Sequence, residues 1–166
     1  MNDLYTEVCV KKKVTVQDTL IKLAVIAGVV LCIGAGLVYG NLLLGFLGMV
    51  GAVCAYLLLP RLKVMYEYVF CDGQLDFDKI MAGEKRKHMY RLDFENVAVM
   101  APVNSHALDS YKSNGAGVLD FSSKEPDRKV YAIAEVRGET QKLIYFEPNE
   151  KLISYIKQKA PRKVTE

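Results

Sequence analysis

The residues of this sequence that could carry out a reaction are few, and the first group lies within one short stretch. Ser105, His106 and Asp109 are the residue types of a hydrolytic triad. A serine nucleophile of this kind sits on a tight G-x-S-x-G turn, and its partners come from separate elements that face it. Neither feature is present here, so we expect no catalytic residue in the chain.

Acidic side chains, histidines and thiols also fail to form a metal-binding pattern. Asp72, Asp76 and Asp78 lack the D-x-D-x-D-G spacing and the distal glutamate of a calcium loop. His88 and His106 have no cysteine or histidine at ligand spacing, and the four cysteines form no C-x-x-C pair. The sequence therefore predicts free thiols, no bound metal and no cofactor.

Positive charge is densest beside a predicted hairpin turn. Basic residues near an anionic bilayer contribute ~1 kcal/mol each to membrane binding, so this cluster is a candidate lipid-contact site. The alternative interpretation is a solvated loop. The chain's net charge of only +3 gives little support to nucleic-acid binding. The cluster consists of Lys85, Arg86, Lys87, His88 and Arg91.

A long predicted loop, residues 103–116, is the second candidate contact surface. Loops of this length are uncommon in compact domains and often bind partners. We expect either a surface for a protein partner or an irregular loop without a role. The candidate contact residues are His106, Leu108, Tyr111, Lys112 and Asn114.

The elements that must position these residues begin with an uncharged apolar segment, residues 23–60. As one helix it would be about 57 Å long, nearly twice the ~30 Å hydrocarbon core of a bilayer. Near its middle, Gly40 favours a helix end and Asn41 favours a helix cap. The sequence therefore predicts a transmembrane hairpin with spans at about 23–38 and 42–59.

Small residues recur along both predicted spans and would let helices approach closely in lipid. They either pack the hairpin on itself or join it to a second copy of the chain, and the sequence leaves both readings open. The candidate helix-packing residues are Gly28, Gly36, Gly40, Gly48, Gly51, Ala52 and Ala55.

Lysine and arginine flank the apolar segment on both sides, whereas its predicted turn has no charge. Because positive residues stay on the cytoplasmic side, we expect both termini in the cytoplasm and the hairpin in the inner or plasma membrane. A cleaved signal peptide is the rival reading. The apolar segment is longer than the usual stretch of about 7–15 residues and has no small-residue cleavage site before charged sequence, which argues against it.

After Arg61 the pattern changes to alternating strands, with Asp72-Gly73 as a two-residue hairpin turn. We expect an α+β membrane protein whose residues 61–160 form a seven-stranded antiparallel β-barrel or sandwich capped by a C-terminal helix. Residues 1–22 are expected to be a cytoplasmic polar tail with a short surface helix, and residues 161–166 a disordered basic tail.

Several stretches carry a family resemblance: Met1–Glu7, Tyr66–Tyr68, Gly73–Ile80 and Met100–Pro102. With the apolar hairpin before them, they resemble a family of small bacterial two-span membrane proteins with a pleckstrin-homology-like (PH-like) cytoplasmic domain. The resemblance covers most of the chain and implies a PH-like fold, but no enzyme chemistry, cofactor or ligand. Eukaryotic phosphoinositide-binding members place basic residues on the first hairpin loop, where this chain has Asp72-Gly73. We therefore expect no phosphoinositide binding there.

The expected function is a membrane-anchored, non-enzymatic interaction or scaffold module that binds a protein partner or a second copy of itself. One alternative is a sensor of anionic lipid that uses the basic cluster. The other is an accessory subunit of a membrane enzyme or transporter. The predicted spans contain no ionisable residue, which argues against a transport pathway through them.

Overall fold

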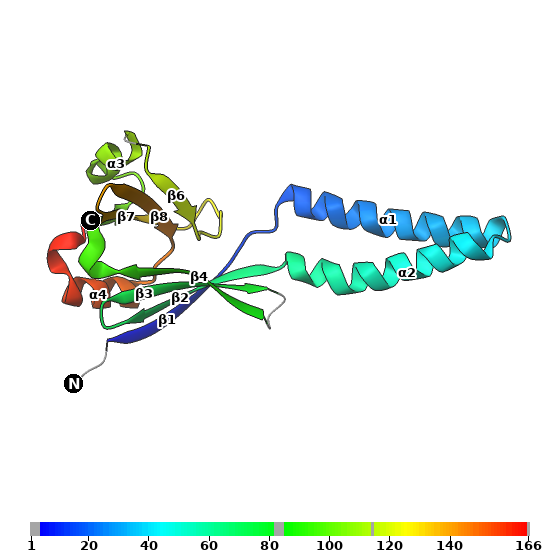
Figure 1. Ribbon diagram of the computed structural model, residues 1–166, viewed down its shortest axis with the longest axis horizontal. Helices are drawn as coiled ribbons and strands as arrows, with labels where there is room; N and C mark the ends of the chain where they lie inside the picture. The colour runs from blue at the N-terminus through cyan, green and yellow to red at the C-terminus, as the bar shows by residue number, and fades with distance from the viewer. Residues whose placement is uncertain (1–3, 82–84, 114, 166) are drawn as a thin grey trace. The chain divides into compact units, whose positions relative to one another are not determined.

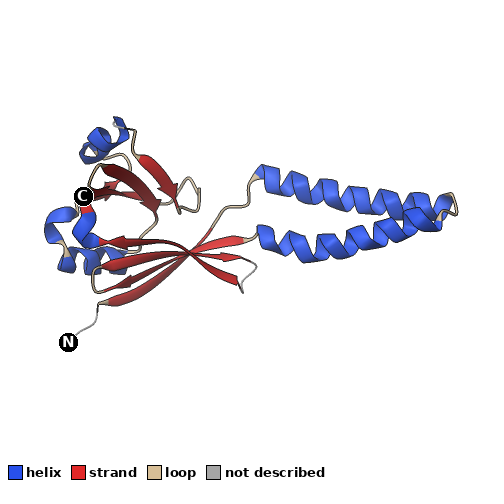
Figure 2. Cartoon of the chain, in the orientation of Figure 1, coloured by secondary structure: helices blue, strands red, loops and turns tan. Residues whose placement is uncertain are grey.

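The structure, a computed structural model, describes residues 4–81, 85–113 and 115–165 (Figures 1 and 2). It divides into two compact units, a helical hairpin at residues 14–64 and a β-domain built from residues on both sides of that hairpin. The predicted turn at residues 82–84 lies outside the described residues. Each unit is described by itself.

The helical unit consists of α1 (Val16–Val38) and α2 (Leu42–Leu58), which lie side by side in Figure 1. The predicted fold-back point is confirmed, because Gly40 has a φ of +63° and the Asn41 Oδ1 atom accepts a hydrogen bond from the Leu43 N–H at 3.1 Å. α1 begins earlier than the predicted span. The Asp18 carboxylate accepts the Thr15 N–H at 3.0 Å and so caps an additional polar turn.

One of the two helices is long and apolar enough to cross a bilayer. α1 meets that requirement, and its most apolar stretch of 18 residues contains no buried residue, whereas α2 is apolar but shorter. Leu31 and Leu37, for example, are 71% and 80% exposed. By length and composition, then, α1 is a candidate membrane anchor or signal sequence, and the second span stays a prediction.

The two helices approach most closely at glycines. A Cβ atom on Gly36 would lie 2.6 Å from the Gly45 backbone nitrogen, and one on Gly48 would lie 2.6 Å from the Ile33 side chain. Gly51 is looser, with Val29 at 3.4 Å, and a Cβ on Gly28 or Gly40 would meet nothing within 4 Å. Ala52 and Ala55 are half-buried. The contact that the sequence did not indicate is Gly45, the direct neighbour of Gly36.

The β-domain contains two four-stranded sheets. The strands of the first lie in the order β1 (Tyr5–Lys11), β2 (Val64–Cys71), β3 (Gln74–Met81) and β4 (Lys85–Asp93). β1 and β2 pair antiparallel from Tyr5↔Cys71 to Lys11↔Met65. The expected tail with a surface helix at residues 1–22 is therefore wrong for residues 5–11. Thr6 and Val10 are buried on one face of that strand, and β2 satisfies its backbone groups.

The strands of the second sheet lie in the order β5 (Val97–Pro102), β7 (Tyr131–Arg137), β8 (Thr140–Phe146) and β6 (Gly117–Asp120). β6 pairs parallel to β8, whereas β5 with β7 and β7 with β8 pair antiparallel. The described chain thus has eight strands in two separate sheets. The prediction of seven strands, all antiparallel, in a barrel or sandwich is corrected in the number of strands, in the parallel β6–β8 pair and in the barrel alternative, since the sheets do not close. The α+β class is confirmed.

The core lies among the two sheets and the C-terminal helix α4 (Glu150–Lys159). Tyr68 and Phe77 from the first sheet and Phe146 from the second are fully buried and make edge-to-face ring contacts. Leu152 and Ile156 of α4 complete this cluster, as the apolar face of the predicted helix required. Asn149 caps α4 by accepting the Leu152 N–H at 2.8 Å.

Candidate functional site

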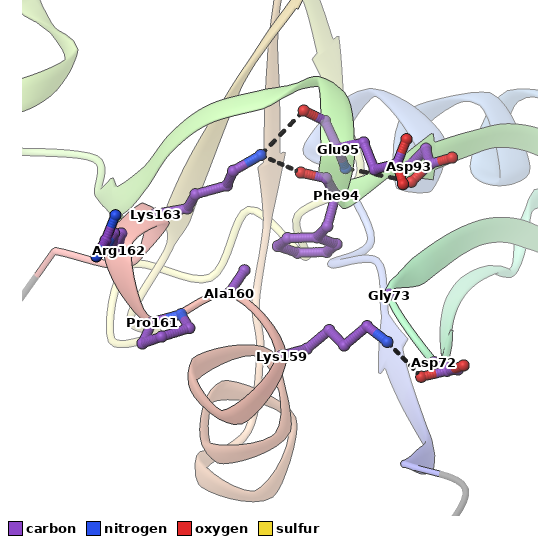
Figure 3. A pocket seen from close by; sticks show the side chains of 10 residues that line it. All are labelled: Asp72, Gly73, Asp93, Phe94, Glu95, Lys159, Ala160, Pro161, Arg162 and Lys163. Carbon is purple, nitrogen blue, oxygen red and sulfur yellow. Dashed lines mark hydrogen bonds and ion pairs between the residues drawn. The ribbon is translucent and has the colours of Figure 1, made fainter.

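A pocket of about 490 Å³ opens in the β-domain where the end of α4 meets the β2–β3 turn (Figure 3). It combines acidic and basic side chains around one buried aromatic ring, Phe94. The lining residues come from the β2–β3 turn, from η2 (Phe94–Asn96) and from the segment that follows α4. They are Asp72, Gly73, Asp93, Phe94, Glu95 and residues 159–163.

The β2–β3 turn forms one side of the pocket. Asp72 and Gly73 have φ angles of +43° and +97°, as expected for the predicted two-residue hairpin turn. The Gly73 carbonyl accepts the Phe94 N–H at 2.9 Å, and the Lys159 ammonium lies 2.7 Å from Asp72 Oδ1. The turn thereby connects the end of α4 with η2. Both charged groups of the ion pair are exposed, so it adds little stability.

The chain after α4 forms the opposite side. The Lys163 ammonium donates to the Phe94 carbonyl at 2.6 Å and to the Glu95 carbonyl at 2.9 Å, as the dashed lines in Figure 3 show. These contacts hold η4 (Pro161–Lys163), a short 3-10 helix, against η2. The expectation of a disordered basic tail is therefore corrected for residues 161–165.

Beyond η4, the tail lies along the edge of the second sheet. Val164 forms a parallel β-bridge with Met100 of β5, and the Thr165 N–H donates to the Met100 carbonyl at 2.8 Å. The other side of β5 pairs with β7. The site therefore combines backbone carbonyl acceptors, an apolar contact and a partly acidic pocket. Groups of this kind bind a peptide segment and do not by themselves carry out a reaction. The signal for this site in the sequence is weak, a Lys-Val-Thr run of moderate β-propensity.

The predicted lipid-contact cluster lies on β4, where carboxylates from neighbouring strands neutralise much of it. Arg86 forms an ion pair with Glu67 of β2, and its Nε atom lies 3.6 Å from Asp78 Oδ2 of β3. The His88 Nδ1 atom lies 2.9 Å from Asp78 Oδ1. Both carboxylates are buried and both basic groups half-exposed, so the Arg86 and His88 side chains cover the carboxylates on this face of the sheet.

The rest of the cluster is divided between a paired arginine and two exposed lysines. Arg91 makes a two-point contact with Asp76, at 2.7 and 2.8 Å, and these hydrogen bonds raise the pKa of the guanidinium. Lys85 and Lys87 are exposed and have no hydrogen bond or ion pair with the described residues. Lipid contact by this cluster would therefore depend mainly on those two lysines.

The predicted loop at residues 103–116 is partly helical, with η3 (His106–Leu108) and α3 (Asp109–Ser113). Leu108 is fully buried in a small core cluster, so it cannot contact a partner in this conformation. Tyr111 is half-buried against the same cluster, and the Lys112 ammonium donates to the Val103 carbonyl at 2.6 Å. Of the predicted contact residues only His106 is fully exposed, and Asn114 lies outside the described residues.

The three residue types of a hydrolytic triad do not assemble into one. His106 Nδ1 lies 3.0 Å from Asp109 Oδ2, within one exposed turn. The Ser105 hydroxyl instead accepts the Ala107 N–H at 3.4 Å and caps η3. Across the described ranges, no group of three or more His, Cys, Asp or Glu side chains is placed to hold a metal ion.

A buried polar cluster connects the two sheets. Glu135 of β7 is 2% exposed and accepts a hydrogen bond from the Tyr90 hydroxyl of β4. The Lys142 ammonium of β8 donates to the same hydroxyl at 3.2 Å and lies over the Tyr90 ring. Burial, and then the hydrogen bond to Glu135, raises the pKa of Tyr90. The Tyr90 hydroxyl thus satisfies one oxygen of this interior carboxylate, Oε2, while the other, Oε1, has no hydrogen bond among the described residues and lies 2.8 Å from Arg137 Nε as an ion pair.

Comparison with known proteins agrees with this architecture. A family model described as "Bacterial PH-like domain (DUF6106)" matches residues 2–166. Searches of curated proteins and of solved structures gave no match. The PH-like resemblance seen in the sequence is thus confirmed over nearly the whole chain, and this protein belongs to the bacterial PH-like domain family DUF6106.

Proposed function

We propose that this protein is a membrane-anchored interaction module. Its helical hairpin crosses the bilayer twice, and its PH-like β-domain binds a protein partner on the cytoplasmic side. The observation that carries the proposal is the pairing of β1 with β2, because these strands precede and follow the hairpin in the chain.

That pairing constrains how often the segment between the strands can cross a membrane. β1 and β2 are hydrogen-bonded from Tyr5↔Cys71 to Lys11↔Met65, and a sheet of this kind lies on one side of a bilayer. The number of crossings between the strands must then be even. A single span would separate them, and cleavage of a signal peptide would remove β1. α2 has 17 residues, the lower limit of about 17–25 for a span.

The flanking charges support the orientation. Lys11, Lys12 and Lys13 precede the hairpin and Lys63 follows it, whereas the turn is uncharged. Positive residues favour the cytoplasmic side, which places the β-domain there. In this orientation Cys9 and Cys71 lie in the reducing cytoplasm, whereas Cys32 and Cys54 lie within the membrane. Both locations are consistent with four free thiols.

Two findings support binding of a protein over the alternatives. PH-like families are generally non-catalytic, and the pocket beside η2 presents backbone acceptors and no assembled triad. In the basic cluster, Arg86, His88 and Arg91 are already paired with carboxylates. A protein surface therefore fits the described site better than an anionic lipid surface does.

Site-specific labelling in intact bacterial cells tests the topology. Single cysteines replace Glu7, Tyr39 or Glu139 in a chain without its natural cysteines, and a membrane-impermeant maleimide is added from outside. We expect labelling of position 39 in intact cells, and of positions 7 and 139 only after lysis. Two results would refute the two-span arrangement. One is labelling that places positions 7 and 139 on opposite sides of the membrane, and the other is a position 39 that is shielded from outside while the chain is in the membrane.

Photo-crosslinking tests the interaction role. A photoreactive amino acid at exposed positions of the β-domain, for instance Ala98 and Glu139, should give discrete protein adducts in living cells. A matched position on the lipid-facing side of α1, Leu31, serves as the control for random collisions in the membrane. If no exposed β-domain position gives an adduct above that control, the interaction role is refuted.

A further inference from the structure

We propose that the free edge of β5 is a docking site for an extended segment of another protein, and that the chain's own residues 161–165 occupy this site as an intramolecular ligand. The partner segment has a basic residue followed by an aliphatic one and runs parallel to β5. This proposal rests on the interaction role above and specifies where that interaction takes place.

The first argument is the state of the edge. β5 pairs with β7 along one side, while on its other side the described residues contribute one bridge, Met100↔Val164, and the hydrogen bond from the Thr165 N–H. Strand edges with unpaired backbone groups are templates for the addition of another strand. Six residues, Val97–Pro102, form β5, so a single bridge leaves most of this edge available to a longer segment.

The second argument is how the tail is held, because it shows which chemistry the site accepts. The Lys163 ammonium is shared by the Phe94 and Glu95 carbonyls, at 2.6 and 2.9 Å. Val164 is half-buried against the main core cluster. A basic side chain followed by an aliphatic one therefore fits two adjacent subsites, one polar and one apolar.

The third argument is charge. The pocket that receives the Lys163 side chain is also lined by Asp93 and Glu95, and Asp93 accepts the Glu95 N–H at 3.2 Å. These carboxylates favour a cationic segment over an acidic one. Lys159 lines the same pocket, but its ammonium pairs with Asp72. Arg162 lines it too and has no hydrogen bond or ion pair with the described residues, so Lys163 is the cation of the tail that is specifically held.

The tail is also suited to being displaced. It leaves α4 at Ala160, whose backbone is non-helical with φ −136° and ψ 63°, and Pro161 ends the helix. Its attachment to the rest of the domain depends on the Lys163 side chain, the Val164 bridge and the Thr165 N–H. A partner that pairs with several β5 residues forms more backbone hydrogen bonds than this short tail does.

The experiment measures binding of a labelled peptide with the tail's own sequence, Ala-Pro-Arg-Lys-Val-Thr, by fluorescence anisotropy. The protein is the full chain in detergent micelles, titrated to about 1 mM so that weak complexes are detected. The released variant carries Lys163→Ala and Val164→Asp, which removes the two side-chain contacts of the tail, the Lys163 hydrogen bonds and the Val164 apolar contact, but leaves the edge intact. The matched control is Arg162→Ala. It removes a cation from the same tail, but one that has no hydrogen bond or ion pair with the described residues.

We expect the released variant to bind the peptide at least tenfold more tightly than the wild-type chain, and Arg162→Ala to behave as wild type. A peptide with aspartate in place of valine should not bind. If the released variant binds no peptide, the docking site is refuted. If it binds no more tightly than wild type, occupation by the tail is refuted.

A second variant guards against misfolding of the first. A chain that ends at Ala160 lacks the tail altogether and must give the same binding, and both variants must retain the far-ultraviolet circular dichroism of the wild type. In wild type, amide exchange of Thr165 should be slowed, since its N–H is bonded to Met100; rapid exchange there also overturns the proposal. None of these outcomes depends on the labelling result at position 39, so the two proposals can fail separately.

Discussion

Gly36→Ala should separate α1 from α2, although it adds only one methyl group. The new Cβ atom would lie 2.6 Å from the Gly45 nitrogen and 2.8 Å from its Cα atom, whereas ordinary contact begins at 3.4 Å. The helices must therefore move apart by about 0.8 Å at their closest point. The obstacle is backbone, which cannot rotate away. Overpacking of this kind costs about 1–3 kcal/mol, so we expect a loss of that size in the stability of the hairpin.

Gly28→Ala provides the matched control, because it adds the same methyl group to the same helix at a point where nothing lies within 4 Å. The assay is unfolding of the full chain in mixed detergent micelles of increasing dodecyl sulfate content. Energy transfer is followed between dyes at cysteines that replace Val14 and Lys63, near the two ends of the hairpin. We expect Gly36→Ala to shift the midpoint to lower dodecyl sulfate and Gly28→Ala to leave it within error. Equal shifts for both would refute the close approach of the helices.

Three further predictions concern the β-domain. Tyr68→Phe removes the buried hydroxyl that donates to the Phe121 carbonyl at 2.5 Å, and should lower the free energy of unfolding in urea by about 1–3 kcal/mol. Burial raises the pKa of Tyr68 above its usual value of about 10, so the folded state keeps this proton longer than the unfolded state does. The urea midpoint should therefore be insensitive to this group below about pH 10 and fall at higher pH, and Tyr68→Phe should lessen that fall. Arg86→Ala leaves the buried Glu67 carboxylate without its cation and should cost about 1–3 kcal/mol, whereas the exposed Lys87→Ala should stay within about 0.5 kcal/mol; equal losses would contradict the pairing.

Features that depend on neighbouring residues could be predicted from the sequence. Gly40 and Asn41 marked the fold-back point because a positive φ and a side-chain cap are local requirements, and the structure has both. Asp72-Gly73 marked the first hairpin for the same reason. The strands that follow the hairpin and the C-terminal helix could be predicted from hydrophobic periodicity, which needs no knowledge of distant partners.

Features that depend on distant residues could not be predicted. Thr6, Val8 and Val10 alternate as a strand should, but their partner β2 begins only at Val64, after the whole hairpin. The alternation alone does not distinguish a strand from a polar tail. The number of strands and the failure of the sheets to close as a barrel follow from such long-range pairing.

The surroundings of the candidate contact sites could not be predicted, for the same physical reason. Arg86 reads as an available cation in the sequence, but its carboxylate partners come from two other strands, Glu67 on β2 and Asp78 on β3. The tail reads as disordered because its partner, Met100, lies far away in sequence. Charge density along a sequence indicates where cations are, and only the fold shows which of them are already paired.

The helical hairpin lies between β1 and β2 in the chain, and this order has a consequence for biosynthesis. A ribosome makes β1 first, then both helices, and only afterwards β2. At about 5–20 residues per second, the intervening residues take roughly 3–10 s to synthesise. Throughout that interval the Tyr5–Lys11 strand has no β2 to pair with. A nascent chain whose helices failed to fold back would keep the two strands apart, so completion of the first sheet reports that the helices have folded back on each other.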